Sequence, residues 1–168
     1  MAHEIRLTIE SAVGVDEVFA AFGDAEYWHA RLAAFGNGKA ALDDLVVESS
    51  DTVTVAVTVS LLRDKLPGVF TQLYGGDIRL VRTERWTRSG GSRVAGAVTA
   101  TMPGAPLSVV GDASMEPTSG GSRLEYTARV NARIPLLGNK IESYVAERAG
   151  EEIPAIQHFT TQWISENR

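Results

Sequence analysis

Charged side chains stand inside two apolar patterns of this sequence. Residues 76–88 alternate in polarity, and Arg82 and Glu84 share a face with the apolar residues Ile78, Leu80 and Trp86. Near the C-terminus, Glu152 falls in the middle of an apolar stripe with helical spacing. A buried charge without a partner costs several kcal/mol, so such groups are paired, solvated inside a cavity, or outside it after a register shift. We expect Glu152 to meet Arg82 with Glu84 nearby, in a cluster that orients a ligand or ties helix to sheet.

Other groups that could do chemistry are poorly placed for it. Of the three histidines, His3 stands beside a terminus and His158 winds to the far side of the C-terminal stripe. The adjacent acids at 43–44 and 151–152 point apart on a strand or a helix, so neither pair resembles a two-carboxylate catalytic site. The string GNGKAA at 36–41 has the wrong context for a dinucleotide loop. We therefore predict no catalytic residue, no metal and no cofactor.

Composition excludes several classes of protein. The chain of 168 residues has no cysteine, which excludes disulfides, thiolate metal sites and a cysteine nucleophile. It carries 16 basic and 21 acidic residues, so its field repels polyanions, and no basic patch for nucleic acid stands out. No apolar run approaches the roughly 18 residues of a membrane span. The opening MAHEIRLTIE is charged where a secretion signal is apolar, so we expect a cytoplasmic protein.

The N-terminal third predicts one strand followed by two short helices. Alternating polarity indicates a strand over residues 3–11. Acidic residues after Gly14 favour a helix that ends at Gly23, and Asp24 can cap a second helix ending at 36–38. The second helix presents one apolar face, formed by Trp28, Leu32 and Phe35.

The middle of the chain is typical of an antiparallel meander. Period-two patterns predict six further strands, over residues 42–48, 52–61, 76–88, 92–102, 107–117 and 122–134. The pentapeptide SGGSR occurs at 89–93 and again at 119–123, each time between two strands, as turn chemistry that is used twice.

Residues 137–166 predict a long amphipathic helix. Its apolar stripe lies on one side, formed by Ile141, Val145, Ala149, Ile153, Ile156, Phe159, Thr160 and Trp163. Pro154 lacks the N–H that the helix needs, so we expect a kink or a break into two helices there. A local break would turn Glu152 toward solvent, and Arg148 could then take its place.

This order of elements resembles the helix-grip fold of the START-like, or SRPBCC, superfamily, which includes Bet v 1-like proteins. VGVDEVFAAFGDAEYW (13–28) is similar to the opening helices of that superfamily, and the ending Trp163-Ile164 also fits. LRDKLPGVFTQLYGG (62–76) resembles the insert of a bacterial branch of unassigned function. The resemblance implies a single α+β domain over 1–168, in which a seven-stranded antiparallel curved sheet wraps around the C-terminal helix. It also implies a cavity that binds lipids or other apolar molecules.

The connections predict that this cavity opens at one end of the sheet. Successive connections of a meander alternate between the two ends, so residues 66–75, 102–106 and 134–138 share an end. They are longer and more apolar than the turns at the other end, which is typical of a binding mouth or an interface. Residues 66–75 form either a lid over the mouth or a plug of ordinary core.

Three function classes follow from these patterns. We favour binding or carriage of a hydrophobic small molecule or lipid over a cyclase, lyase or hydrolase that uses cavity acids, and over a protein-docking module of the cochaperone or toxin-like kind. The partner would be that small molecule, without nucleic acid or stable membrane insertion. The expected ligand-binding residues are Val69, Phe70, Leu73, Tyr74, Arg82, Glu84, Trp86, Tyr126 and Glu152.

Overall fold

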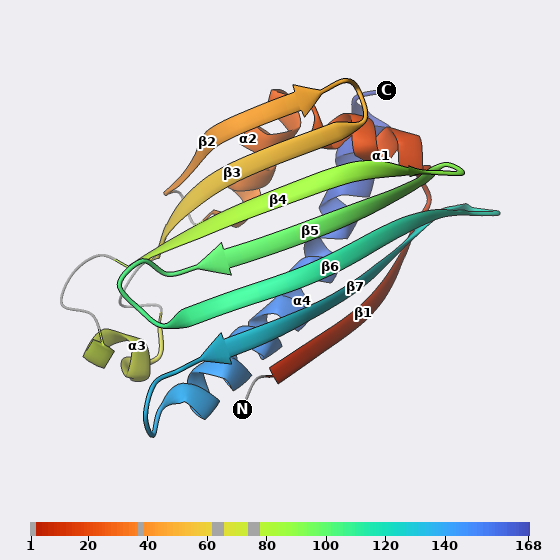
Figure 1. The fold of residues 1–168 in the computed structure, drawn as a ribbon. Coiled ribbons are helices and arrows are strands. Elements are labelled where there is room, and N and C mark those ends of the chain that lie inside the picture. The colour runs from red at the N-terminus through yellow and green to blue at the C-terminus, as the bar shows by residue number, and fades with distance from the viewer. Residues whose placement is uncertain (1–2, 37–38, 62–65, 74–77) are drawn as a thin grey trace.

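Seven strands form one antiparallel sheet within the part of the chain that the structure describes (Figure 1). The structure is a computed structural model that describes all residues except 1–2, 37–38, 62–65 and 74–77, and the side chains of 71–73. The strands are β1 (His3–Ser11), β2 (Ala40–Glu48), β3 (Thr52–Leu61), β4 (Ile78–Gly90), β5 (Arg93–Thr101), β6 (Leu107–Thr118) and β7 (Gly121–Ala132). They lie in the order β1-β7-β6-β5-β4-β3-β2, so β1 and β2 are the edges.

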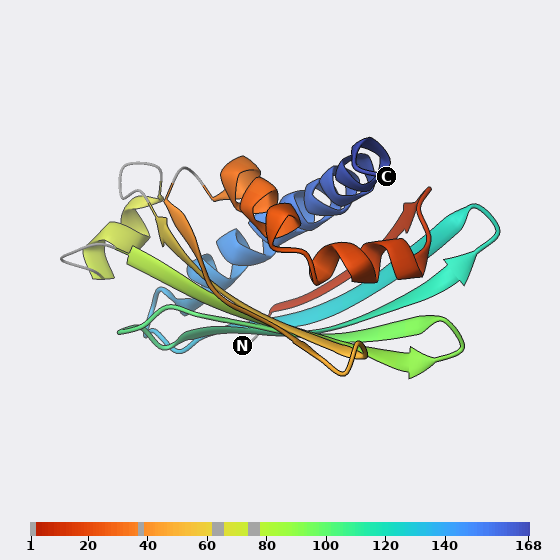
Figure 2. The same cartoon turned by 90° about the horizontal axis from the view of Figure 1, so that it is seen from above.

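The helices cover one face of this sheet. Two short helices, α1 (Val15–Phe22) and α2 (Ala25–Phe35), connect β1 to β2, and α3 (Gly68–Leu73) lies between β3 and β4. The long helix α4 (Gly138–Glu166) crosses the sheet and packs on β1 and β7. Figure 2 shows the sheet curving beneath α1, α2 and α4, which lie on its concave side. The predicted α+β architecture, a curved sheet around a C-terminal helix, is confirmed.

Local sequence explains where the two short helices begin and end. The Asp24 carboxylate accepts a hydrogen bond from the Glu26 N–H at 2.9 Å, which caps α2 as predicted. Gly23 follows the last residue of α1, and its N–H donates to the Ala20 carbonyl, so α1 ends there. These signals turn the chain between α1 and α2 and set their apolar faces on the sheet.

The helix α4 corrects one expectation, because it continues unbroken through Pro154. Of the two expected outcomes at Pro154, a kink or a break into two helices, the break is therefore wrong. Proline removes one hydrogen bond of the helix, while buried side chains on both sides, Ile141 before it and Ile156 and Ile164 after it, hold the helix against the sheet. Packing of the amphipathic face thus outweighs the local cost of the proline.

The two ends of the sheet differ as the connections predicted. The short turns β2–β3, β4–β5 and β6–β7 meet at one end, and α3, the β5–β6 connection and the β7–α4 connection gather at the other (Figure 1). Five of the predicted strands differ from the structure at their ends: β2 begins at Ala40, β4 reaches Gly90, β5 runs over Arg93–Thr101, β6 ends at Thr118, and β7 runs over Gly121–Ala132. These shifts leave the inward and outward faces of the strands unchanged.

An aromatic cluster fills the space between the sheet and the C-terminal half of α4. Its rings lie 4.7 to 6.3 Å apart and come from α1, α2, β4 and α4: Phe22, Tyr27, Trp28, Trp86, Phe159 and Trp163. Such contacts add to the large apolar area that each ring buries. Gly96 on β5 makes room for the cluster, since a Cβ there would lie 2.4 Å from the Trp86 ring.

Candidate functional site

A cavity of about 540 Å³ lies between the sheet and the helices, beside the aromatic cluster. The strands β3, β4, β5, β6 and β7 supply one wall, and α2, α3 and α4 supply the other. Its lining is mostly aliphatic and aromatic, and includes Val57, Val59, Leu61, Leu80, Ala100, Met102, Leu107, Val109, Phe70 and Tyr144. Native cores contain few voids larger than one water molecule, so this cavity is a feature of the fold and not a packing defect.

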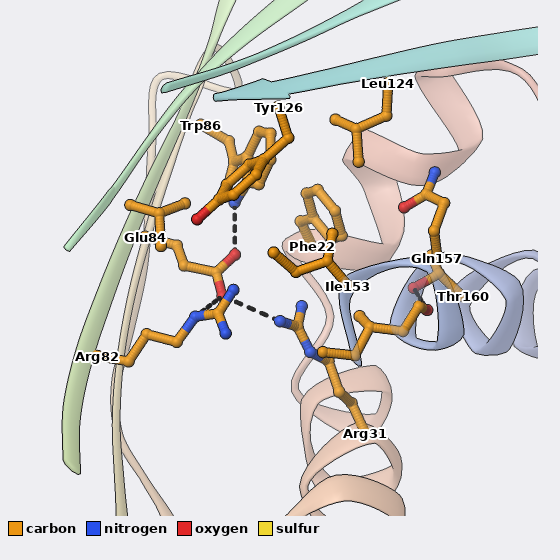
Figure 3. A pocket seen from close by; sticks show the side chains of 12 residues that line it. Phe22, Arg31, Arg82, Glu84, Trp86, Leu124, Tyr126, Ile153, Gln157 and Thr160 are labelled. Carbon is orange, nitrogen blue, oxygen red and sulfur yellow. Dashed lines mark hydrogen bonds and ion pairs between the residues drawn. The ribbon is translucent and has the colours of Figure 1, made fainter. Parts of the chain in front are cut away.

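Among the described lining residues, five are charged: Arg31, Arg82, Glu84, Arg148 and Glu152. Three of them meet at the boundary between the cavity and the aromatic cluster. We call Arg31, Glu84 and Arg82 the charged trio. Arg31 Nη2 donates to Glu84 Oε2 at 3.1 Å, and Arg82 Nε lies 2.8 Å from the same oxygen. Figure 3 shows the two guanidinium groups approaching the carboxylate from different sides.

The two-residue period of β4 and the helical turn of α2 determine where the side chains of the charged trio point. Arg82 and Glu84 are two residues apart on β4, so both point to the concave face of the sheet. Arg31 stands one turn after Trp28 on α2, and its guanidinium carbon lies 4.5 Å from the centre of the Trp28 ring. Helix and strand thus bring opposite charges together from positions 53 residues apart in the sequence.

Glu84 is ionised in this environment. Its other oxygen, Oε1, accepts the indole N–H of Trp86 at 3.0 Å. Burial alone would raise the pKa of Glu84, but Arg31, Arg82 and the Trp86 N–H stabilise the carboxylate and hold its pKa below the usual value. The two arginines and the indole therefore occupy this carboxylate, although only 2% of the residue is exposed.

A second, smaller pocket adjoins the trio on the side of the aromatic cluster. Its volume is about 30 Å³, which is the space of roughly one water molecule. Gln157 on α4 lines this inner pocket and is 4% exposed (Figure 3). Within the described residues, the Nε2 atom of Gln157 has no hydrogen-bond partner. Besides the charged trio, the other lining residues are Phe22, Trp86, Val98, Leu124, Tyr126, Ile153, Ile156 and Thr160.

The structure places most of the predicted site residues around these two spaces. Phe70, Arg82, Glu84, Tyr126 and Glu152 line the cavity, and Trp86 lines the inner pocket. Val69 packs half-buried on the core without lining either space. Tyr74 and the side chain of Leu73 lie outside the described residues.

The expected ion pair between Glu152 and Arg82 is wrong. The nearest cation to Glu152 among the described ion pairs is Arg148, one turn away on α4 at 3.9 Å, and the Glu152 side chain is 38% exposed. Helical phase does set Glu152 on the cavity wall, but Arg82 turns to Glu84 on its own strand. Arg31 was missed, and a usable signal was its position one turn after Tyr27 and Trp28, on the buried face of α2.

The expected mouth is found in part. Leu66, Phe70 and Met102 line the cavity at the α3 end, whereas residues 134–138 contribute no lining side chain. Phe70 is 1% exposed and packs edge-on against Tyr144 of α4, with ring centres 5.4 Å apart. The lining residue most exposed to solvent lies on α4, at Arg148. The cavity lining therefore also reaches the surface on α4.

The described residues form neither a metal site nor a membrane span. Over the described ranges, no group of three histidine, aspartate or glutamate side chains could hold a metal ion. His3 Nδ1 instead lies 3.3 Å from Glu142 Oε1, away from the cavity. None of the described helices is both long enough and apolar enough to cross a bilayer.

Comparisons with known proteins agree with this geometry. A model of the family described as "Protein of unknown function (DUF2505)" matches residues 6–164. The uncharacterized protein Rv0481c of Mycobacterium tuberculosis (strain ATCC 25618 / H37Rv) is 37% identical over 163 residues, which cover 91% of each chain.

Solved structures share the fold at low sequence identity. The crystal structure of TTHA0849 from Thermus thermophilus has a TM-score of 0.62 at 14% identity and covers 98% of this chain and 99% of that chain. A START superfamily protein from Mycobacterium smegmatis has a TM-score of 0.53 at 11% identity and covers 96% and 99%. The chain thus belongs to the DUF2505 family, and its fold is the helix-grip fold of the START-like, Bet v 1-like superfamily.

Proposed function

We propose that this protein binds or carries an apolar small molecule or lipid in the cavity between the sheet and α4. The observation that carries the proposal is the cavity itself, about 540 Å³ with mostly hydrocarbon walls. This volume falls in the range of about 300–1,000 Å³ that is common for small-molecule sites. An apolar ligand would gain the transfer free energy of leaving water and would restore the van der Waals contacts that the empty walls lack.

The polar groups of the cavity support a site with a defined orientation. Three of the five charged lining residues gather at the inner end, where the charged trio meets the aromatic cluster, and Arg148 and Glu152 lie on α4. A few convergent polar groups in an otherwise apolar pocket are typical of ligand sites, because they fix which end of the ligand enters first.

Binding is better supported than acid-base catalysis. A general acid or base must hold or take a proton near its working pH, and Glu84 is instead kept ionised by Arg31 and Arg82. Docking of a protein on the α3 end also has less support. Phe70 is buried, and among the described residues Leu136 is the only large hydrophobic side chain of that end classed as exposed.

Titration with Nile red, a neutral apolar fluorophore, tests the proposal. We expect saturable emission at one site per chain, and displacement of the dye by 1-dodecanol. Ala100→Phe on β5 points into the cavity and should abolish the signal, whereas Ala97→Phe points outward from the same strand and should preserve it. Equal binding by the two variants, or no saturable binding by the parent protein, would show that the cavity is not the site.

A further inference from the structure

The charges that line the cavity do not balance. The described lining residues include three arginines and two glutamates, which leaves one positive charge in excess. In the charged trio, Arg31 and Arg82 share the carboxylate of Glu84, and Glu152 adds a charge interaction with Arg31. An uncompensated cation at a desolvated site is costly, so this excess calls for an anion that the described protein groups do not supply.

Glu84 interacts more favourably with Arg31 than with Arg82. Arg31 is 6% exposed, donates a hydrogen bond to Glu84 Oε2, and stacks on Trp28. The buried Nε of Arg82 lies 2.8 Å from the same oxygen, but its N–H is not aligned to form a hydrogen bond with it. Among the described ion pairs, Arg82 approaches Glu84 through Nε.

Arg82 also faces the space where a ligand would lie. Its side chain is 24% exposed, against 7% for Arg31, and it belongs to the lining of the cavity. A guanidinium offers several N–H donors in a fixed fork that matches the two oxygens of a carboxylate. The Arg82 side chain lines the cavity as well as the inner pocket, so its guanidinium is within reach of a ligand in the cavity.

The apolar wall continues from Arg82 in one direction. On β4 the next inward residue toward α3 is Leu80, which pairs with Val59 of β3, and Phe70 lies beyond them. A molecule with its charged end at Arg82 would thus lay its hydrocarbon along these side chains.

We propose that the ligand is an aliphatic monocarboxylate, bound with its carboxylate against Arg82 and its chain along Leu80 and Val59 toward Phe70. This inference rests on the proposed function, because it requires that the cavity be occupied by an apolar molecule. One carboxylate neutralises the single excess charge of the cavity, whereas a doubly charged phosphate monoester would exceed it.

Isothermal titration with four ligands of equal chain length tests the inference on the unmodified protein. The ligands are dodecanoate, 1-dodecanol, dodecylammonium and dodecyl phosphate, each below its micellar concentration at pH 8. A charge-assisted hydrogen bond contributes about 1.5–3 kcal/mol, so dodecanoate should bind roughly 10 to 100 times more tightly than 1-dodecanol. Dodecylammonium should bind more weakly than the alcohol, and dodecyl phosphate more weakly than dodecanoate.

Two arginines of β4 provide a matched pair of variants. Arg82→Met should reduce the affinity for dodecanoate to that for 1-dodecanol and leave the alcohol unaffected. Arg85→Met is the control, because Arg85 is exposed on the same strand, one residue after Glu84, and lines neither pocket. Arg82→Lys, which keeps the charge and loses the fork, should give an intermediate preference for dodecanoate.

The outcomes separate this inference from the proposed function. Equal affinities for dodecanoate and 1-dodecanol would contradict the proposal that the ligand is a carboxylate, but would still be consistent with an apolar binding site. A preference for dodecanoate that survives Arg82→Met would overturn the role of Arg82. Failure of all four ligands and of Nile red to bind would overturn the proposed function itself. The comparison of the four ligands uses the unmodified protein, so it still tests the inference if Arg82→Met does not fold.

Discussion

The two halves of α4 face the same sheet, but one half packs on aromatic rings and the other borders a cavity. In the C-terminal half, Phe159 and Trp163 contact the Tyr27 ring of α2, which in turn contacts Phe22 of α1. The N-terminal half lines the cavity with Tyr144, Val145 and Ala149. We call these regions the filled half and the hollow half. The cavity thus lies beside the aromatic cluster, and Trp28 of the cluster forms part of its wall.

The charged trio lies at the border between these halves. Its Trp86 contact belongs to the filled half, and the exposed part of Arg82 belongs to the hollow half. A polar cluster at this border can specify the inner limit of the cavity, because Arg31 and Glu84 are buried while Arg82 is partly exposed. The comparison predicts that equivalent substitutions will have different effects in the two halves.

The largest effect should come from Phe22→Ala in the filled half. Phe22 is 4% exposed and contacts the rings of Tyr27, Trp28 and Trp86, so its removal leaves a void in packed surroundings. We expect a loss of about 3–5 kcal/mol in the free energy of unfolding. Leu80→Ala only enlarges an existing cavity and should cost less than about 2 kcal/mol. Urea denaturation measures both, and equal losses would contradict the division into halves.

Glu84→Gln should have the next largest effect, because it leaves two arginines without their carboxylate. We expect a loss of about 3 kcal/mol in unfolding free energy. Glu152→Gln is the matched control, and its loss should stay under about 1 kcal/mol, since Glu152 is 38% exposed and 3.9 Å from Arg148. If thermal and urea unfolding ranked the two variants in the opposite order, Glu152 and not Glu84 would hold the polar cluster together.

Replacing a small side chain by a larger one should also change the unfolding free energy differently in the two halves, but by a smaller amount. Ala113 on β6 is 7% exposed and lines neither pocket, so Ala113→Leu should strain its surroundings and cost about 1–3 kcal/mol. Ala100 on β5 lines the cavity, and Ala100→Leu should fit with little loss of stability. Comparable destabilisation by both, measured in the same urea series, would mean that the hollow half is packed more tightly than the structure shows.

The smallest effect on stability should be that of Phe70→Leu, at about 1 kcal/mol. This change keeps an apolar side chain but weakens the contact with Tyr144, and it distinguishes the lid from the plug. If α3 acts as a lid, stopped-flow release of Nile red should be faster in Phe70→Leu and unchanged in Val69→Ala, which does not line the cavity. An unchanged release rate in Phe70→Leu would identify Phe70 as a plug.

Much of the fold could be predicted from the sequence because its signals are local. Alternating polarity set the strands, Asp24 and Gly23 set helix ends, and chain order set which connections share an end of the sheet. The break expected at Pro154 was wrong, because the loss of one helix hydrogen bond is outweighed there by packing along the whole of α4. The position of Arg82 and Glu84 on the inner face followed from period two alone.

The partners of the buried charges could not be predicted in the same way. Arg31 and Glu84 meet only after α2 folds over the sheet, and no spacing in the sequence encodes that distance. The same holds for Glu142, which is 1% exposed and accepts the Ala132 N–H at 2.9 Å where β7 ends. Periodicity gives the face on which a residue lies, whereas tertiary packing chooses its partner.

Methyl NMR during titration with dodecanoate tests most directly whether the hollow half is a binding site. We expect the methyl signals of Val57, Val59 and Leu80 to shift and to saturate at one equivalent, because these side chains line the cavity. The methyls of Val18 and Val94 should stay unchanged, since both are fully buried and line neither pocket. Shifts confined to exposed valines, or no saturable shift of the cavity methyls with either dodecanoate or 1-dodecanol, would contradict the account.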